Sequence, residues 1–366
     1  MDKVKLGDYT EIKTGKLDAN FSNVNGIYPF FTCSNETLKI DKYSYDCECV
    51  LVAGNGDLNV KYYDGKFDAY QRTYIIESKD KNILDTKYLY YLIKSNIGNL
   101  RKSSIGGVIK YIKLGNLTSI ELLPIDILKQ KSIVNELDKI QEIIEIRKKQ
   151  IDELDELINS KFIEMFGDVK KNEKKWNYTT LGKECYLNPK KSELQNISEN
   201  FEVSFVAMQS VSENGNIDTS VIGQYNDVKK RFTYFAENDV LFAKITPCME
   251  NGKGAVAVGL KNKIGFGSTE FHVLRPKEKI NSVWLYTLTA MKSFRIEAER
   301  KMTGSAGQKR VPISFFETYK LGLPPIDLQN QFADIVKQID KKKFEMHKSL
   351  EEIQKLQDSL MNKYFG

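Results

Sequence analysis

An internal repeat constrains this chain more than any other feature of its sequence. Gln130-Lys131-Ser132-Ile133 opens a long helical pattern that closes at Met165-Phe166-Gly167, and Gln329-Asn330-Gln331-Phe332 opens another that closes at Tyr364-Phe365-Gly366. The two copies keep a constant offset of 199 residues without a gap. A repeat of this length means that one structural unit occurs twice, so we expect a pseudo-two-fold fold built from two similar halves.

The segments before the two helical patterns also match. Val4-Lys5-Leu6-Gly7 corresponds to Thr179-Thr180-Leu181-Gly182 at an offset of 175, so the second copy carries about 24 more residues. A proline followed by an aspartate precedes each helical pattern, at Pro124 and Asp126 and again at Pro325 and Asp327, as is typical of a helix start. The predicted domains are a globular part (1–125), a long helix (126–167), a second globular part (168–325) and a second long helix (326–366).

The globular parts predict a mixed α/β (α+β) fold in which strands dominate. Residues 49–53 and 239–245 are short runs rich in β-branched and aromatic side chains, and a Gly/Asn turn signal follows each. One helix is expected in each copy before the last strand, over 86–100 and 283–300.

Apolar side chains in both long helices recur every three and four residues, which is typical of a coiled coil. Arg147 interrupts this seam in the first helix, and Lys343 and Gln357 interrupt it in the second. Antiparallel pairing of the two helices suits the duplication, although each helix could instead pack on its own globular part. The predicted seam comprises Ile133, Leu137, Ile140, Ile144, Ile151, Leu154, Ile158, Phe332, Val336, Ile339, Met346, Leu350 and Ile353.

Positive charge is concentrated outside the helices. The first helix has seven basic and ten acidic residues and the second has seven of each, so that, of a total charge of +6, the globular parts carry +9. This distribution favours nucleic-acid binding by the globular parts and protein contacts by the helices.

Several classes of protein are disfavoured. The five cysteines are scattered and lack paired C-x-x-C spacing, so free thiols are expected rather than a metal site. Only His272 and His347 are present, which makes a Ser-His-Asp triad improbable. No leader-like or membrane-spanning stretch is present, so a cytoplasmic protein is expected.

Four strings of the second globular part, taken together, resemble the target-recognition domain of the specificity subunit of type I restriction-modification enzymes. They are residues 239–248 (DVLFAKITPC), 250–253 (ENGK), 265–276 (GFGSTEFHVLRP) and 304–308 (GSAGQ). Residues 50–56 (VLVAGNG) and 70–73 (YQRT) fill the corresponding places in the first copy, which departs more from the pattern. With two variable domains, each followed by a similar helix, the resemblance covers essentially the whole chain.

The resemblance implies a bipartite DNA target. Each recognition domain would read one half of a split sequence in double-stranded DNA, and the antiparallel helix pair would set the gap. Two modification (methyltransferase) subunits would bind around the helices, and restriction (translocase/nuclease) subunits would join to cleave. The chain itself would be non-catalytic and hold no cofactor, so that S-adenosylmethionine, ATP and Mg belong to the partner subunits; no membrane is involved.

Candidate DNA contacts follow from side-chain chemistry, because Gln, Asn, Arg and Lys pair with base edges while Ser, Thr and Lys commonly hold phosphates. The loops 103–107 and 303–310 are favoured most, since each is rich in small residues and leads into base-competent or cationic side chains. The candidates are Asn55, Lys61, Tyr70, Gln71, Arg72, Ser103, Ser104 and Lys110 in the first part, and Lys244, Thr246, Asn251, Lys253, Ser268, Thr269, Ser305, Gln308, Lys309 and Arg310 in the second.

Motifs for catalysis are weak. Residues 252–257 (GKGAVA) fit a dinucleotide-binding pattern only superficially, because no parallel βαβ pattern surrounds them. The Asn/Asp-Pro-Pro-aromatic string of an amino-methyltransferase is absent from the sequence. A coiled-coil scaffold and a self-contained DNA-modifying enzyme remain as alternatives to the DNA-reading subunit.

Overall fold

The computed structural model describes residues 2–305 and 307–366, and the chain divides into two compact units. The first unit comprises Met1–Lys148 with Lys348–Gly366, and the second comprises Lys149–His347. Met1, where the first predicted domain begins, and Ala306, inside the predicted 303–310 loop, lie outside the described residues. Each unit mixes strands and helices, so the predicted α/β fold class is confirmed.

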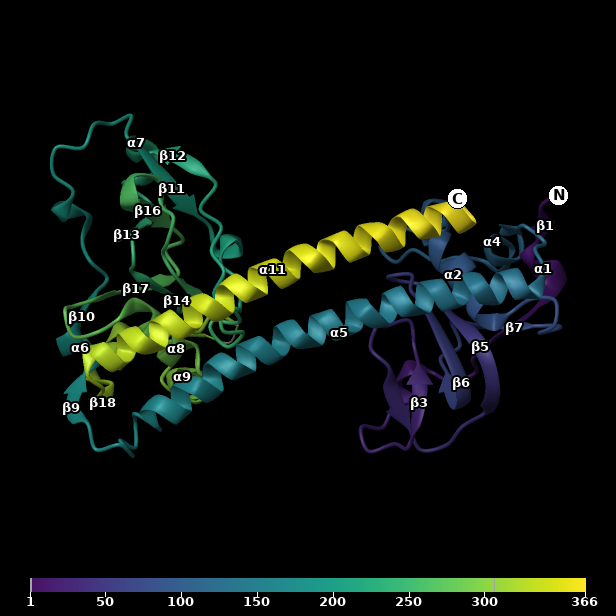
Figure 1. The fold of residues 1–366 in the computed structure, drawn as a ribbon, viewed down its shortest axis with the longest axis horizontal. Helices are drawn as coiled ribbons and strands as arrows, with labels where there is room; N and C mark the ends of the chain where they lie inside the picture. The colour runs from purple at the N-terminus through teal and green to yellow at the C-terminus, as the bar shows by residue number, and fades with distance from the viewer. Residues whose placement is uncertain (1, 306) are drawn as a thin grey trace. The chain divides into compact units, whose positions relative to one another are not determined.

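A twisted sheet forms the centre of the first unit (Figure 1). Its strand order is β2 (Thr10–Thr14), β7 (Thr73–Ser78), β5 (Tyr45–Ala53), β6 (Val60–Ala69), β3 (Tyr28–Phe31) and β4 (Leu38–Ile40). Neighbours are antiparallel except for β3 and β6. Alternate residues of β5 face opposite sides, so that Val50 and Val52 pack towards α2 whereas Cys49 and Leu51 pack into a smaller cluster with Phe67.

Shorter strands and helices complete the first unit. Strand β1 (Val4–Lys5) pairs with β8 (Glu121–Leu122), which brings the start of the globular part to the strand that leads into the long helix. The helices are α1 (Leu6–Tyr9), the 3-10 helix η1 (Ala19–Phe21), α2 (Thr86–Ser95), α3 (Ile97–Ser103) and α4 (Leu114–Thr118).

The second unit contains two four-stranded sheets instead of one larger sheet. The first has the order β10 (Cys185–Leu187), β17 (Phe271–Pro276), β14 (Val240–Ala243) and β15 (Gly254–Val256). The second has the order β12 (Ile222–Gln224), β11 (Glu202–Val206), β16 (Ile264–Gly267) and β13 (Thr233–Ala236), where only β11 and β16 are parallel. This second sheet repeats part of the first unit, since β11 is parallel to β16 and antiparallel to β12 as β3 is parallel to β6 and antiparallel to β4.

The remaining elements of the second unit repeat the plan of the first. Strand β9 (Asn177–Thr180) pairs with β18 (Lys320–Leu323), as β1 pairs with β8. The helices are α6 (Leu181–Glu184), η2 (Lys191–Glu193), η3 (Met208–Ser210), α7 (Tyr225–Val228), η4 (Lys261–Lys263), α8 (Ser282–Ala290), α9 (Lys292–Arg300) and α10 (Ile313–Thr318).

The single helix predicted over 86–100, and again over 283–300, was wrong in both copies. Each region forms two consecutive helices, which break at Asn96 in the first unit and at Met291 in the second. Asn96 ends α2 because its side-chain amide donates to the carbonyl of Leu92 at 2.9 Å. At Met291 the backbone is extended, and the carbonyl of Thr289 accepts from Arg295 Nε at 2.7 Å.

Two forty-residue helices, α5 (Ile127–Phe166) and α11 (Ile326–Phe365), each contribute to both units. The Asp126 carboxylate caps α5 by accepting from the backbone N–H of Leu128 at 2.9 Å and of Lys129 at 3.1 Å. At the other end Gly167 has φ +65 and donates to the carbonyl of Ile163, so a glycine in the left-handed region ends the helix.

Within each unit the helix segments run antiparallel. In the first unit Gln357 Nε2 donates to Gln141 Oε1 at 3.0 Å, and the Tyr364 hydroxyl donates to the Glu136 carboxylate at 2.6 Å. In the second unit Lys343 lies 2.5 Å from Asp155, and the Phe332 ring packs 5.5 Å from Phe162. In both units, higher residue numbers on α5 therefore lie opposite lower residue numbers on α11.

The predicted seam positions face the interior of these units. Ten of the thirteen predicted seam side chains are buried, while Leu154, Ile158 and Ile353 are half-buried. Seam side chains also form part of the hydrophobic core of each unit. In the first unit Ile133 and Leu137 pack with α2, and in the second unit Phe332 and Val336 pack with Trp284. Helix pairing and packing on a globular part, posed as alternatives above, therefore occur together.

Among the described residues, no helix is both long enough and apolar enough to cross a lipid bilayer.

Candidate nucleic-acid interface

Three segments of the first unit meet where strand β5 ends. Gly54 donates its N–H to the carbonyl of Arg72 at 2.8 Å, and it accepts from Ile112 N–H at 2.9 Å. Two residues further on, Gly56 N–H donates to the carbonyl of Lys110 at 2.9 Å. The end of β5, the 70–73 turn and the 103–111 hairpin are thereby held together by backbone hydrogen bonds.

The second unit repeats this arrangement with other side chains. Lys244 N–H donates to the carbonyl of Glu270 at 2.9 Å, and the Lys244 carbonyl accepts from Val311 N–H at 2.9 Å. Thr246 N–H donates to the carbonyl of Lys309 at 3.0 Å. The hydrogen bonds match those of Gly54 and Gly56 one for one, so the end of β14, the 268–270 turn and the 303–310 hairpin form the equivalent three-segment surface.

Most of the candidate contacts lie on these two surfaces. In the first unit Gln71, Arg72, Ser103 and Lys110 are exposed while Asn55, Tyr70 and Ser104 are half-buried. A hollow of about 290 Å³ lies beside Gln71, Arg72 and Tyr111. In the second unit the exposed candidates are Asn251, Thr269, Ser305, Gln308 and Lys309, and the half-buried ones are Lys244, Thr246, Lys253, Ser268 and Arg310.

Some candidates are already engaged with the protein. Lys61 Nζ donates to the carbonyl of Ser34 at 2.7 Å, which places it against the neighbouring 32–37 loop, and burial lowers its pKa. The Thr246 hydroxyl donates to Glu250 at 2.8 Å, and the Ser268 hydroxyl accepts from Glu270 N–H at 3.2 Å. Burial likewise lowers the pKa of Lys244.

Arg310 pairs with a carboxylate that sequence reasoning did not single out. Its Nε lies 3.0 Å from Glu270 Oε2, and its Nη2 lies 2.9 Å from Glu270 Oε1, which is a two-pronged ion pair. The Arg310 guanidinium also lowers the pKa of the Glu270 carboxyl, which keeps that group ionised. Side-chain chemistry gives no signal for Glu270, because a carboxylate repels phosphate. An alignment of the two copies would place Glu270 opposite Arg72, since their carbonyls accept equivalent hydrogen bonds.

The hairpin of the first unit exposes apolar side chains, which was also not anticipated. Val108 and Ile109 are 104% and 63% exposed, and Gly106 allows the turn because its φ is +117. The second hairpin carries polar side chains over the corresponding stretch, including Gln308 and Lys309. The two surfaces thus share a backbone framework and differ in chemistry.

Arg295 is the residue that holds the loop after β14, and no sequence pattern indicated it beyond its place on a helix. It is 5% exposed, stacks 4.0 Å from the Phe242 ring, and donates to the carbonyls of Met249 at 3.1 Å and Gly252 at 3.2 Å. Its burial lowers its pKa to about 10. Arg101 acts in a comparable way in the first unit, since it binds Asp57 at 2.8 Å and the Leu58 carbonyl at 3.2 Å.

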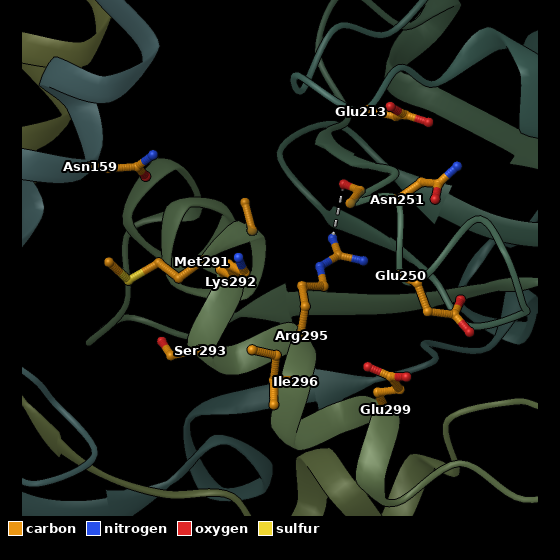
Figure 2. Close-up of a pocket in the computed structure, with 12 residues that line it drawn as sticks. Asn159, Glu213, Glu250, Asn251, Met291, Lys292, Ser293, Arg295, Ile296 and Glu299 are labelled. Carbon is orange, nitrogen blue, oxygen red and sulfur yellow. Dashed lines mark hydrogen bonds between the residues drawn. The ribbon is translucent and has the colours of Figure 1, made fainter. Parts of the chain in front are cut away.

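A pocket of about 690 Å³ opens beside Arg295, between the 247–253 loop and α9 (Figure 2). Glu213, Glu250 and Glu299 line it together with Lys292. Because these carboxylates oppose the entry of a polyanion, this pocket is unsuited to a DNA backbone. Among the described residues, no group of three or more His, Cys, Asp or Glu side chains could hold a metal ion.

Some proteins resemble this chain in sequence, and some solved structures resemble it in fold. The chain is 37% identical over 155 residues to the type I restriction enzyme EcoDI specificity subunit of Escherichia coli, a match that covers 42% of the chain and 34% of that protein. The chain thus spans about a third of the length of this curated relative. The S subunit of a type I restriction-modification system from M. genitalium has a similar fold, with a TM-score of 0.59, 17% identity and coverage of 100% of this chain and 96% of that one.

A second solved structure, from work on complex assembly and conformational transition of the type I R-M system, gives a TM-score of 0.55 at 14% identity and covers 100% of this chain and 97% of that one. The sequence profile described as the type I restriction modification DNA specificity domain matches residues 1–156 and 166–357, which is most of the chain. The chain therefore belongs to the family of type I restriction-modification DNA specificity domains.

Proposed function

We propose that this chain is the DNA sequence-specificity subunit of a type I restriction-modification enzyme, and that it reads a bipartite target in double-stranded DNA. The observation that carries the proposal is the three-segment surface, which occurs once in each unit on the same backbone framework. Different side chains on a shared framework suit two readers of different half-sites. The candidate contacts named above would supply the base and phosphate contacts.

The domain limits follow from this proposal. Residues 1–125 and 168–325 would be the two target-recognition domains, and 126–167 and 326–366 the helices that join them. A forty-residue helix is about 60 Å long, which exceeds the roughly 34 Å between successive major grooves on one face of DNA. We infer that the paired helices act as the spacer that sets the gap between half-sites.

The partners follow from the family. Two modification subunits would dock around the helices, whose net charge of −3 contrasts with the +9 of the globular parts, and restriction subunits would join to cleave. The chain itself would catalyse nothing, so S-adenosylmethionine, ATP and Mg would be bound by those partners. A complex that acts on the DNA of its own cell would work in the cytoplasm.

The test is a DNA assay on the chain assembled with its modification partner. With S-adenosylmethionine, the complex is expected to methylate a split motif, and its affinity for DNA is expected to fall steeply with salt because phosphate contacts release counterions. The chain alone is expected to transfer no methyl group. Turnover by the chain alone would indicate a self-contained enzyme, and a complex without salt-sensitive DNA affinity would indicate a scaffold.

A further inference from the structure

The Arg310–Glu270 pair leaves part of the Arg310 guanidinium available for another acceptor. A guanidinium has five N–H groups. Glu270 takes the one on Nε and one on Nη2, and the carbonyl of Gln308 accepts from Nη1 at 3.0 Å. One N–H on each terminal nitrogen remains for a further acceptor, and the Arg310 side chain is 41% exposed at the surface of the 303–310 hairpin.

The geometry points to Arg310 as the residue that reads a guanine in the half-site of the second unit, with Glu270 as the positioning residue that holds it. This inference rests on the proposed function and deepens it by naming a base. Guanine presents two acceptors, O6 and N7, at its major-groove edge, and arginine binds them with two donors.

The Glu270 carboxylate favours contact of Arg310 with a base rather than with a phosphate. Glu270 neutralises the charge of Arg310, which weakens attraction for a polyanion but leaves the direction of the remaining N–H groups fixed. A phosphate contact depends on net charge, whereas a base edge is neutral and depends on the placement of donors. Both side chains are anchored through the backbone, since the Glu270 carbonyl accepts from Lys244 N–H and Arg310 pairs with Thr303 across the hairpin.

The first unit lacks this pair although its backbone is arranged alike. Arg72 occupies the place of Glu270, because its carbonyl accepts from Gly54 N–H as that of Glu270 accepts from Lys244 N–H. Tyr111 occupies the place of Arg310, because it bridges to Ile105 as Arg310 bridges to Thr303. An arginine–glutamate pair that reads guanine is therefore expected only in the half-site of the second unit.

The experiment replaces each guanine of the recognised motif, one at a time, by 7-deazaguanine, which lacks the N7 acceptor but still pairs with cytosine. Affinity is measured at fixed salt for the full chain assembled with its modification subunits. At one guanine, in the half-site that changes when residues 168–325 are exchanged, we expect a loss of roughly ten- to hundredfold. At the same guanine, 7-deazaguanine should lower the DNA affinity of the Arg310→Ala complex less than twofold, because this variant already lacks the guanidinium that binds N7.

Two further variants separate reading from structure. Arg310→Lys keeps the positive charge but lacks the paired donors of a guanidinium. This variant should therefore lose discrimination between guanine and adenine at that position. Glu270→Gln should lose discrimination while keeping or raising affinity for unrelated DNA, because it removes a negative charge. Unchanged discrimination at the first half-site shows in each case that the complex is folded.

Three results would overturn the inference: a second half-site without guanine, no sensitive guanine in it, or a 7-deazaguanine penalty that survives in Arg310→Ala. All three leave the proposed function intact, since the wild-type complex would still read a split motif. A wild-type complex without any sequence preference would overturn both.

Discussion

Lys343 of α11 lies 2.5 Å from the carboxylate of Asp155 on α5, within the second unit. Lys343 interrupts the apolar seam of α11, as Gln357 does further along the helix, and it is 9% exposed. One repeat length earlier, 199 residues away, its counterpart is Ile144, so this ion pair has no duplicate in the first unit. A polar pair at a single seam position fixes the register of two helices, because any shift would bury its charge without a partner.

We expect Asp155→Ala to lower the free energy of unfolding by about 1–3 kcal/mol, since it leaves the Lys343 ammonium buried and unpaired. Urea denaturation of the purified chain measures this loss. The matched control is Glu156→Ala, which removes an exposed carboxylate from the same helix turn. Replacing both partners by leucine should restore most of the stability; equal effects of Asp155→Ala and Glu156→Ala would argue against a role for the pair.

A second prediction concerns the glutamines that begin the repeat. Gln329 accepts from Asn281 N–H at 3.0 Å and donates to the carbonyls of Lys279 at 3.0 Å and Pro324 at 2.8 Å. Gln130 makes the same three contacts in the first unit, with Asp85, Ile83 and Ile125.

Gln329→Ala should cost about 1–3 kcal/mol, because it leaves the buried carbonyl of Pro324 without its partner, together with the part-buried Asn281 N–H and Lys279 carbonyl. The free energy of unfolding is the measurement, and the control is Gln331→Ala on the exposed side of the same helix. Similar losses for the two variants would mean that the backbone groups find other partners.

These glutamines also show what the sequence could predict. A gapless offset placed Gln130 and Gln329 at equivalent helix starts, and the three- and four-residue spacing predicted which positions of α5 and α11 are buried. The breaks at Asn96 and Met291 were missed, because the helical pattern of apolar residues continues across both.

The candidate interface was predictable only in part. The small and base-competent residues of 103–107 and 303–310 predicted two loops, but they did not predict which other segments lie beside those loops. The role of Glu270 and of Arg295 depends on contacts 40 and more residues away along the chain, with Arg310 and with the 249–253 carbonyls, and no local pattern encodes such pairings.

The third prediction is a pH dependence from His272. This side chain is 5% exposed; its Nε2 lies 2.8 Å from the carbonyl of Val311, and its Nδ1 lies 3.2 Å from the Asn188 amide. Burial lowers the pKa of His272 to about 4, with Lys244 acting in the same direction and Glu270 against it. In the unfolded chain the pKa is near 6.5, so between these values the unfolded state binds a proton that the folded state does not.

Stability should therefore fall as the pH is lowered, by about 2 kcal/mol between pH 7 and pH 5 from this group. Denaturation of His272→Gln at both pH values isolates the effect, because the variant should lose about that much less on acidification. His347, which is exposed, supplies the control as His347→Gln. If His272→Gln and the wild type lose equal stability, the imidazole is not held neutral.

The fourth prediction addresses the division of the target between the units. Exchanging residues 168–325 for the second recognition domain of another family member should change one half of the methylated motif and leave the other half and the gap intact. Sequencing the methylated DNA of cells that express the hybrid with its modification partner gives the result. The reciprocal exchange of residues 1–125 should change only the other half, and changes in both halves after either exchange would contradict independent readers.

The fifth prediction concerns the gap between half-sites. Matched seven-residue insertions after Lys148 in α5 and after His347 in α11 would preserve the apolar seam and lengthen both helices by about 10 Å, or about three base pairs of DNA. The gap in the methylated motif should widen by up to that amount while both half-sites stay the same. Replacing seven residues at the same sites without changing the length is the control and should leave the gap as it is. A complex that still methylates its motif with the original gap after the insertions would show that something other than the helix pair sets the spacing.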